Sequence, residues 1–162
     1  EAHIKVAGIS VLGVNGIKSR IKIPAYGKYL RRLILKNRLE GKVRVLGNLS
    51  AEEMKREYLS AQIFVCPSAV ENSPNSVAEG QLLGVPVAAS RTGGIPDVVK
   101  DGVSGLLFEK GNVHELAACV SRILTDKQLA KELSASERET AAKLYNGENN
   151  YQKLIEIYQS IE

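Results

Sequence analysis

The feature that most constrains the fold is the run of residues 63–99, in which two apolar segments flank a short helical segment. Residues 63–66 (IFVC) form a continuous apolar run, which is typical of a strand buried on both faces. Ser73 and Pro74 favour the start of a helix, with Ser73 as the N-cap and Pro74 as the first helical residue. A glycine ends that helix, and residues 85–90 (VPVAAS) are predicted to form the next buried strand. The pattern predicts a strand, a loop, a helix, a second strand, a glycine-rich turn and a short helix.

The start of this central helix is a candidate anion site with an acidic residue on each side. The N–H groups of Asn75 and Ser76 lie in the first turn, at the positive end of the helix dipole, where a phosphate or diphosphate binds well. Glu71 precedes the helix, and Glu79 lies about a turn and a half into it. A carboxylate can accept two hydrogen bonds from a vicinal diol such as a ribose, so the spacing fits a nucleotide-sugar. Taken alone, the spacing favours the simpler alternative of two solvated surface acids.

Strands and helices alternate along most of the chain. This order predicts a Rossmann-like α/β fold, with a parallel sheet and helices on both faces. Ligands bind such sheets at the carboxyl ends of the strands, so the loops at residues 47–49, 67–74 and 90–95 are expected to share one rim. The further predicted elements are strands at residues 3–9, 43–47 and 104–108, a loop at 10–27, and helices at 26–39, after 50, at 113–125, at 127–144 and at 148–161.

Two of the predicted helices begin with capping boxes, in which Ser50 pairs with Glu53 and Asn112 pairs with Glu115. The last helix carries apolar and aromatic residues at helical spacing, which predicts a core or packing face. These residues are Tyr151, Leu154, Ile155, Tyr158 and Ile161.

Composition narrows the classes of function. A chain of 162 residues with 44% hydrophobic and 25% charged residues can form one globular domain with a core. Residues 1–60 carry a net charge of +8, mostly within residues 18–44, and this basic region could meet anionic lipid headgroups or phosphorylated acceptors, although a solvated helix face is the simpler alternative. Nucleic acid is a poorer candidate because no aromatic array accompanies the charge. No membrane span or signal peptide is expected, and Cys66 and Cys119 are predicted to be buried thiols of a cytoplasmic protein.

Several motifs follow one another in an order that is found in a known family. Seven residues separate Glu71 from Glu79, and three segments follow, Gly-Val-Pro-Val at residues 84–87, Gly-Gly-Ile-Pro-Asp at 93–97 and Asp-Gly-Val-Ser-Gly-Leu-Leu at 101–107. In these motifs the chain resembles the retaining glycosyltransferases of the family 4 type, also called group 1. The segment ENSPNS resembles a bacterial branch of that family.

The resemblance implies a two-domain architecture, known as GT-B, with a cleft between two Rossmann-like domains. Residues 1–162 would be the C-terminal, donor-binding domain, without the acceptor domain and the first strand region. The implied donor is a nucleotide-diphosphate sugar, most often a UDP-sugar, and the acceptor is a glycan or a lipid-linked molecule bound by the N-terminal domain. The expected role is synthesis of cell-surface polysaccharide or lipopolysaccharide in the cytoplasm, with a peripheral position at the inner face of the cell membrane.

The resemblance also assigns roles to residues. Glu71 would contact the transferred sugar and lie nearest the chemistry, as the catalytic residue, and Glu79 would hold the ribose hydroxyls. The other implied donor-binding residues are Ser73, Asn75, Ser76, Thr92, Gly93 and Gly94 around the diphosphate, and Gly47, Asn48 and Leu49 around the base. The helix dipole and positive charge would stabilise the leaving diphosphate without a metal ion. The family's Arg and Lys for that purpose come from a region upstream of this chain, so the chain alone is expected to be inactive.

Two other functions are compatible with the same fold. One is a non-catalytic module that binds a nucleotide-sugar, and the other is a nucleotide-sugar epimerase, for which no histidine-rich acid–base set is visible. The chain also departs from the family at Gly80, where a small helix former such as Ala is usual. That glycine could mark a close contact of the central helix.

Overall fold

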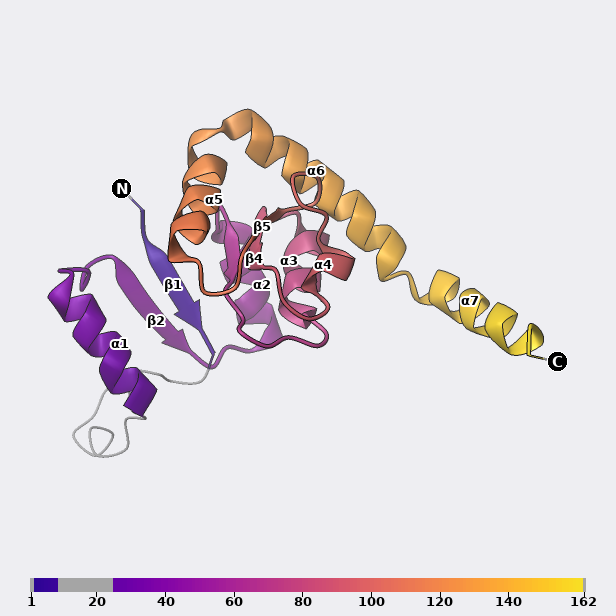
Figure 1. Ribbon diagram of the computed structural model, residues 1–162, viewed down its shortest axis with the longest axis horizontal. Helices are drawn as coiled ribbons and strands as arrows, with labels where there is room; N and C mark the ends of the chain where they lie inside the picture. The colour runs from indigo at the N-terminus through magenta and orange to yellow at the C-terminus, as the bar shows by residue number, and fades with distance from the viewer. Residues whose placement is uncertain (1, 9–24, 162) are drawn as a thin grey trace. The chain divides into compact units, whose positions relative to one another are not determined.

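The computed structural model describes residues 2–8 and 25–161, and the chain divides into two compact units, Glu1–Arg56 and Glu57–Glu162 (Figure 1). Each unit combines parallel strands with helices, which confirms the predicted α/β class. That residues 1–162 form a single domain stays a prediction. The loop predicted at residues 10–27 lies outside the described residues as far as residue 24, and its last three positions already belong to a helix.

In the first unit, β1 (Ile4–Ala7) pairs in parallel with β2 (Val43–Gly47). Parallel neighbours need a crossover connection, and α1 (Ala25–Lys36) lies in that connection. The predicted strand at residues 3–9 is therefore found, although Ile9 lies outside the described residues.

Helix α1 ends earlier than the predicted Leu39. Arg38 has a φ of 55°, in the left-handed region that ends a right-handed helix. The Leu33 carbonyl accepts from both the Asn37 N–H, at 3.0 Å, and the Asn37 side chain, at 2.8 Å, so this residue closes the last turn. The predicted stop at Gly41 is thus wrong, because the chain leaves the helix at Asn37.

Helix α2 (Ala51–Ser60) begins in the first unit and ends in the second. Its predicted capping box is confirmed. The Ser50 N–H donates to Glu53 Oε2 at 2.8 Å, and the Glu53 N–H donates to Ser50 Oγ at 3.3 Å.

The second unit is built on three parallel strands, β3 (Phe64–Cys66), β4 (Val87–Ser90) and β5 (Leu106–Phe108), with β4 in the middle. All four residues of β4 are buried, as the continuous apolar run predicts for a central strand. Each strand begins one or two residues later than its predicted bounds.

Helices cover both faces of this sheet, as expected (Figure 1). Alternate residues of a strand point to opposite faces, so β4 contributes to two separate cores. The first core joins the sheet to α3 (Asn75–Leu83) and α4 (Ile95–Val98), and its residues are Cys66, Val77, Val87, Ala89, Ile95, Val99 and Leu107. The second joins it to α5 (Val113–Thr125) and α6 (Lys127–Leu144), and its residues are Ala88, Leu106, Phe108, Ile123 and Leu133.

Helix α6 closes the C-terminal end of α3 with polar contacts. Gly84, with a φ of 70°, ends α3 in the left-handed conformation. Ser134 Oγ donates to the Gly84 carbonyl at 2.7 Å, and Arg138 Nη2 donates to the Leu83 carbonyl at 3.1 Å. These bonds satisfy carbonyl groups that the end of a helix leaves without a partner.

A buried carboxyl group lies between these two contacts on α6. Glu137 Oε1 accepts a 2.8 Å hydrogen bond from the Val87 N–H, while its Oε2 is buried with no partner among the described residues. Burial raises the pKa of Glu137 to about 8, although the bond from Val87 opposes that rise. The side chain is therefore mostly protonated at neutral pH.

The bounds of α5 and α6 are confirmed to the residue. The predicted capping box of α5 is only half formed. Asn112 accepts from the Glu115 N–H at 3.1 Å, but the Glu115 carboxylate accepts from the Glu109 N–H instead, because the Asn112 N–H already donates to the Glu109 carbonyl.

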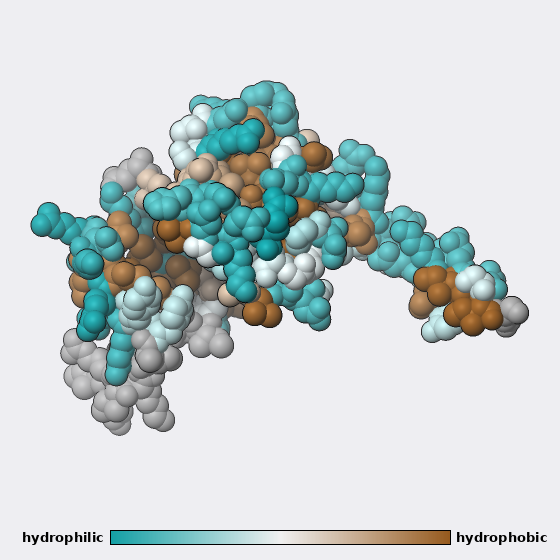
Figure 2. Space-filling model, in the orientation of Figure 1, coloured by the Kyte–Doolittle hydropathy of each residue, from teal (hydrophilic) through white to brown (hydrophobic). Residues whose placement is uncertain are grey.

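The prediction of a core face on the last helix, α7 (Gly147–Gln159), is wrong for the described structure. Tyr151, Leu154 and Tyr158 are exposed, as is Ile161 beyond the helix end, and only Ile155 is half-buried. The helical spacing is amphipathic as expected, but no described segment packs against the apolar side, and Figure 2 shows it as an open hydrophobic surface. Within the described residues, no helix combines the length and the apolar character that crossing a membrane requires.

Candidate functional site

The site is built around the N-terminal end of α3, where one predicted detail is wrong. The N-cap is Pro74 and not Ser73, because Pro74 has a ψ of 73°, outside the helical range, and helical geometry begins at Asn75. A proline has no side-chain oxygen, so this end has no side-chain cap. The Asn75 N–H turns back to the Ser73 carbonyl at 2.9 Å, while the Ser76 N–H has no partner among the described residues. One of the two predicted anion-binding N–H groups is thus open.

Glu71 lies in the loop between β3 and α3, half-buried, and its side chain has a partner. Ser68 Oγ donates to Glu71 Oε2 at 3.3 Å, and the same hydroxyl lies 3.5 Å from Cys66 Sγ. Ser68 therefore links the end of β3 to the carboxylate.

The loops that follow β3 and β4 are joined by a ladder of three hydrogen bonds. Ser90 Oγ donates to the Ser68 carbonyl at 2.6 Å, and Thr92 Oγ1 donates to the Ala69 carbonyl at 3.4 Å. The Gly94 N–H donates to the Glu71 carbonyl, also at 3.4 Å. The structure thus brings Thr92 and Gly94 next to the Glu71 loop, although the Thr92 hydroxyl already donates its hydrogen bond to that loop.

The two glycines after β4 are required by this close approach. A Cβ on Gly93, which has a φ of 52°, would collide with the Glu71 carbonyl oxygen. A Cβ on Gly94 would lie 2.5 Å from the Asn72 carbonyl oxygen. Glycine therefore lets one loop rest on the backbone of the other, and the position of Glu71 depends on both.

Glu79 is exposed on α3, and a buried tyrosine lies beside it. The Tyr58 hydroxyl donates to the Ser76 carbonyl at 2.9 Å. Burial, together with the neighbouring Glu79 carboxylate, raises the pKa of Tyr58 well above its ordinary value. The hydroxyl therefore stays neutral at any physiological pH.

Three residues of this site, Tyr58, Ser68 and Ser90, are not apparent from sequence reasoning. Ser68 lies two residues after the end of β3, and Ser90 is the last residue of β4; parallel sheets place ligand-binding groups at such positions, which is a usable signal. Tyr58 lies inside a polar helix, and only its contact across the fold marks it.

The remaining predicted donor-binding residues, Gly47, Asn48 and Leu49, lie in the first unit at the end of β2. Gly47 has a φ of 74°, and its carbonyl accepts from the Gly8 N–H at 2.9 Å. Asn48 is exposed, and Leu49 is half-buried. They form a strand-to-helix turn, and their role around a base stays a prediction.

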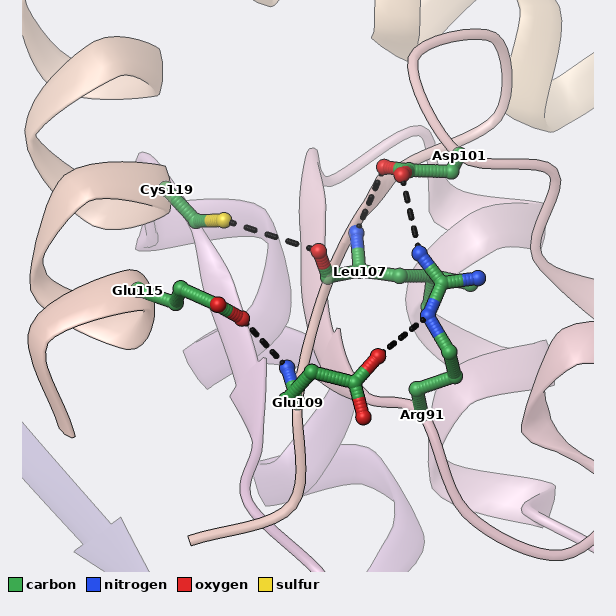
Figure 3. A network of polar contacts seen from close by, with 6 residues as sticks. All are labelled: Arg91, Asp101, Leu107, Glu109, Glu115 and Cys119. Carbon is green, nitrogen blue, oxygen red and sulfur yellow. Dashed lines mark hydrogen bonds and ion pairs between the residues drawn. The ribbon is translucent and has the colours of Figure 1, made fainter. Parts of the chain in front are cut away.

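Arg91, which follows β4, is held in an ion-pair network (Figure 3). Its guanidinium lies 3.0 Å from Asp101 Oδ2 and 3.0 Å from Glu109 Oε1. Asp101 Oδ1 also accepts from the Leu107 N–H at 2.9 Å. Two carboxylates thus neutralise Arg91, and it is no free cation for a bound diphosphate.

The two cysteines are free thiols, one buried as predicted and one only half-buried. Cys119 Sγ lies 3.9 Å from the Leu107 carbonyl at the edge of the Arg91 network (Figure 3), and burial raises its pKa. Among the described residues, no group of three or more His, Cys, Asp or Glu side chains could hold a metal ion. A metal-free reaction stays a prediction.

Comparisons with known proteins agree on one family. Residues 5–140 match the family model described as glycosyl transferases group 1. Among curated relatives, the sulfoquinovosyl transferase SQD2 of Arabidopsis thaliana is 33% identical over 100 residues, which cover 60% of this chain and 20% of the relative. The putative colanic acid biosynthesis glycosyltransferase WcaL of Salmonella typhimurium is 28% identical over 171 residues, which cover 98% of this chain and 42% of the relative.

Among solved structures, Anabaena Alr3699/HepE in complex with UDP superimposes with a TM-score of 0.82 at 22% identity, over 98% of this chain and 41% of that protein. At that identity the likeness establishes the fold alone. The chain spans less than half the length of each of these proteins. Because the family model covers most of its sequence, the chain belongs to the glycosyl transferases of group 1.

Proposed function

We propose that the chain is the donor-binding half of a retaining glycosyltransferase of hexosyltransferase type that uses a nucleotide-diphosphate sugar. The single observation that carries the proposal is the open N-terminal end of α3. It presents the unpartnered Ser76 N–H, with Glu71 in the loop before it and Glu79 one turn further along the helix. An unpartnered N–H at the positive end of a helix dipole favours an anion there.

Each group has a distinct role in the proposal. The N–H of Ser76 binds the diphosphate, and the N–H of Asn75 does so as well once it rotates toward the ligand. The exposed carboxylate of Glu79 accepts hydrogen bonds from the ribose hydroxyls. Glu71 contacts the transferred sugar, since Ser68 holds one carboxylate oxygen and leaves the other available. Structures of Anabaena HepE contain UDP and UDP-glucose, which supports UDP as the nucleotide here.

In the proposed reaction, the bond between the anomeric carbon and the diphosphate oxygen breaks, the acceptor oxygen bonds to the same face of that carbon, and the proton of the acceptor hydroxyl passes to the leaving diphosphate oxygen. The helix N-terminus stabilises the negative charge on the leaving diphosphate, and no metal is required. Arg91 is neutralised by two carboxylates, so the cation that assists departure comes from elsewhere in the protein. For that reason we expect the chain alone to bind donor weakly and to be inactive.

Names of relatives support a role in surface polysaccharide synthesis. Two of them are described as glycosyltransferases of amylovoran and colanic acid biosynthesis. We propose a glycan or lipid-linked acceptor and a cytoplasmic position. The comparisons favour neither a non-catalytic module nor an epimerase.

Titration with UDP, GDP and ADP, followed by calorimetry, tests the proposal on this chain and on the whole protein that contains it. We expect one nucleotide to bind, and Glu79→Ala to weaken it by about tenfold, as the loss of two hydrogen bonds implies. Glu156→Ala on α7, an exposed acid remote in sequence from the site, is the matched control and should leave the affinity unchanged. Absence of nucleotide binding by the whole protein at millimolar concentration would refute the proposal.

A peripheral contact with an anionic membrane is a second proposal, carried by α1. Its exposed side bears Lys28, Arg31, Arg32 and Lys36, the helix contains no acidic residue, and Tyr29 and Leu35 are exposed among the basic side chains. Basic residues beside exposed aromatic and aliphatic groups favour the surface of an anionic bilayer.

Cosedimentation with vesicles rich in phosphatidylglycerol tests the membrane proposal. Arg31→Glu with Arg32→Glu should abolish binding, and phosphatidylcholine vesicles should bind neither protein. High salt should release the unmodified protein, because screening removes the attraction. If the unmodified protein does not bind anionic vesicles even in low salt, the basic side of α1 is only a solvated helix face.

A further inference from the structure

Tyr58 occupies a position that the proposed donor site does not yet use. It is the most deeply buried residue of α2, with 3% of its surface exposed, and it meets the first turn of α3. Its hydroxyl donates to the Ser76 carbonyl at 2.9 Å. The same residue, Ser76, carries the open N–H of the anion site, so Tyr58 holds the peptide unit next to it.

The Glu79 carboxylate lies beside the same hydroxyl. Burial and that carboxylate raise the pKa of Tyr58, so the group keeps its proton. One hydroxyl proton thus faces two acceptors, the Ser76 carbonyl and Glu79. The hydroxyl donates its hydrogen bond to Ser76 and lies beside the exposed Glu79 carboxylate, so a movement of the first turn of α3 would lose that bond and shift the carboxylate with it.

The ring of Tyr58 is held by packing against Phe64, which lies close to Gly80 of α3. Tyr58 packs edge-on against Phe64 at a centroid distance of 5.2 Å and an angle of 69°. A Cβ on Gly80 would lie 3.4 Å from Phe64 Cδ1. That distance is an ordinary van der Waals contact, so alanine would also fit at this position, and Phe64 packs between α3 and the Tyr58 ring.

We infer that Tyr58 is a positioning residue of the donor site, which holds Glu79 in line with the first turn of α3 so that a ribose and a diphosphate are bound together. The inference rests on the proposed function, since it concerns a residue that supports the ligand-binding residues of the same site. Tyr58 is buried and touches no ligand itself; it acts through Ser76, to which it donates, and through the neighbouring Glu79.

Tyr58→Phe tests this role, because it keeps the ring packing and removes only the hydroxyl. The probes are UDP and 2′-deoxy-UDP, titrated into the whole protein. We expect Tyr58→Phe to weaken the binding of UDP by about fivefold and the binding of 2′-deoxy-UDP by less. The preference of the protein for UDP over 2′-deoxy-UDP should therefore fall. Tyr145→Phe, which changes a tyrosine beyond the end of α6, should change neither affinity.

A double-mutant cycle with Glu79→Ala separates positioning from general stability. If Tyr58 acts in part through Glu79, Tyr58→Phe has a smaller effect on UDP affinity once Glu79 is removed. An equal loss in both backgrounds, or equal losses for the two nucleotides, would show that Tyr58 only stabilises the fold and would overturn the inference.

The failures of the two proposals are distinguishable. If the unmodified protein binds no nucleotide, or Glu79→Ala has no effect, the proposed function fails, and the role of Tyr58 fails with it. If those two results are as expected while Tyr58→Phe binds like the unmodified protein, only the positioning role is overturned.

Discussion

The two ends of α3 differ in whether their free backbone groups have hydrogen-bond partners. At the C-terminal end, Gly84 closes the helix in the left-handed conformation, and Ser134 and Arg138 of α6 donate to its last carbonyl groups. At the N-terminal end, Pro74 offers no side-chain cap, and the Ser76 N–H has no partner in the described part of the chain. A helix leaves unpaired donors at one end and unpaired acceptors at the other. This protein satisfies the acceptors and leaves a donor open.

The difference separates stability from binding. The contacts of α6 with the C-terminal end anchor α3 and the strand that follows it, and they involve no candidate ligand group. The N-terminal end is held less directly, by the ladder between the two loops and by Tyr58. Changes at the anchored end should therefore alter the free energy of unfolding and spare nucleotide affinity, whereas changes at the open end should alter both.

The largest predicted effect is a pH dependence of stability that comes from Glu137 at the anchored end. Its pKa is about 8 in the folded protein and near the ordinary value of 4.5 in the unfolded chain, so between these values the folded protein holds an extra proton. The stabilisation is complete below about pH 4.5 and is lost as the pH rises through about 8. Each pH unit in that window lowers the free energy of unfolding by up to about 1.4 kcal/mol.

Urea unfolding at pH 5, 6, 7 and 8 measures this slope. Glu137→Gln keeps an oxygen for the Val87 N–H and has no proton to lose, so its stability should fall less with pH than that of the unmodified protein. Glu139→Gln, on the exposed side of α6, should keep the original slope, because ion pairing with Lys143 lowers the pKa of Glu139 and places its titration below the window. Parallel slopes for the unmodified protein and Glu137→Gln would contradict the assignment.

The next largest effect is expected at the open end, from Gly93→Ala. The new Cβ would collide with the Glu71 carbonyl oxygen, and the residue would also be forced into a left-handed conformation. We expect a loss of about 2–4 kcal/mol in the free energy of unfolding and a loss of nucleotide affinity, since the Glu71 loop must move.

Gly102→Ala is the matched control, because Gly102 has a φ of 74° and open space where its Cβ would lie. It should lose only about 1–2 kcal/mol of unfolding free energy, which comes from the left-handed backbone conformation, and it should keep its affinity for nucleotide. The difference between the two variants measures the contact between the loops. If both variants lose the same stability and the same affinity, the loops do not depend on each other.

Much of the fold could be predicted from sequence because strong local signals set it. The bounds of α5 and α6 match the predicted ranges; Asn112 caps α5 as expected, and Asp126, which interrupts the helical pattern, caps α6. The Ser50–Glu53 capping box and the buried central strand are equally local. The loops around α3 follow from the rule that parallel strands present their ligands at one edge.

What could not be predicted is decided by contacts between distant segments. Glu137 lies in a polar helix and looks like a solvated residue, yet its partner, Val87, is 50 positions away. Tyr58 is marked only by its bond to Ser76, 18 positions along the chain. The N-cap at Pro74 depends on a single backbone angle, and both Ser73 and Pro74 are compatible with a helix start.

The smallest predicted effects come from two single substitutions, Ser90→Ala in β4, which supports the loop before α3, and Ser134→Ala in α6, which supports the C-terminal end of α3. Each hydroxyl donates one hydrogen bond to a carbonyl, at 2.6 Å from Ser90 to Ser68 and at 2.7 Å from Ser134 to Gly84. Each variant should lose about 1 kcal/mol of unfolding free energy. Their effects on UDP affinity should differ, because only Ser90 supports the loop that carries Glu71.

Urea unfolding and UDP titration of the whole protein, performed side by side, check this pair. We expect Ser90→Ala to bind UDP about threefold more weakly and Ser134→Ala to bind it normally. The two changes share no partner, so their effects on stability should add in the double variant. A weakening by Ser134→Ala equal to that by Ser90→Ala would mean that the anchored end also shapes the donor site, because rigidity would then pass along α3 from its last turn to its first.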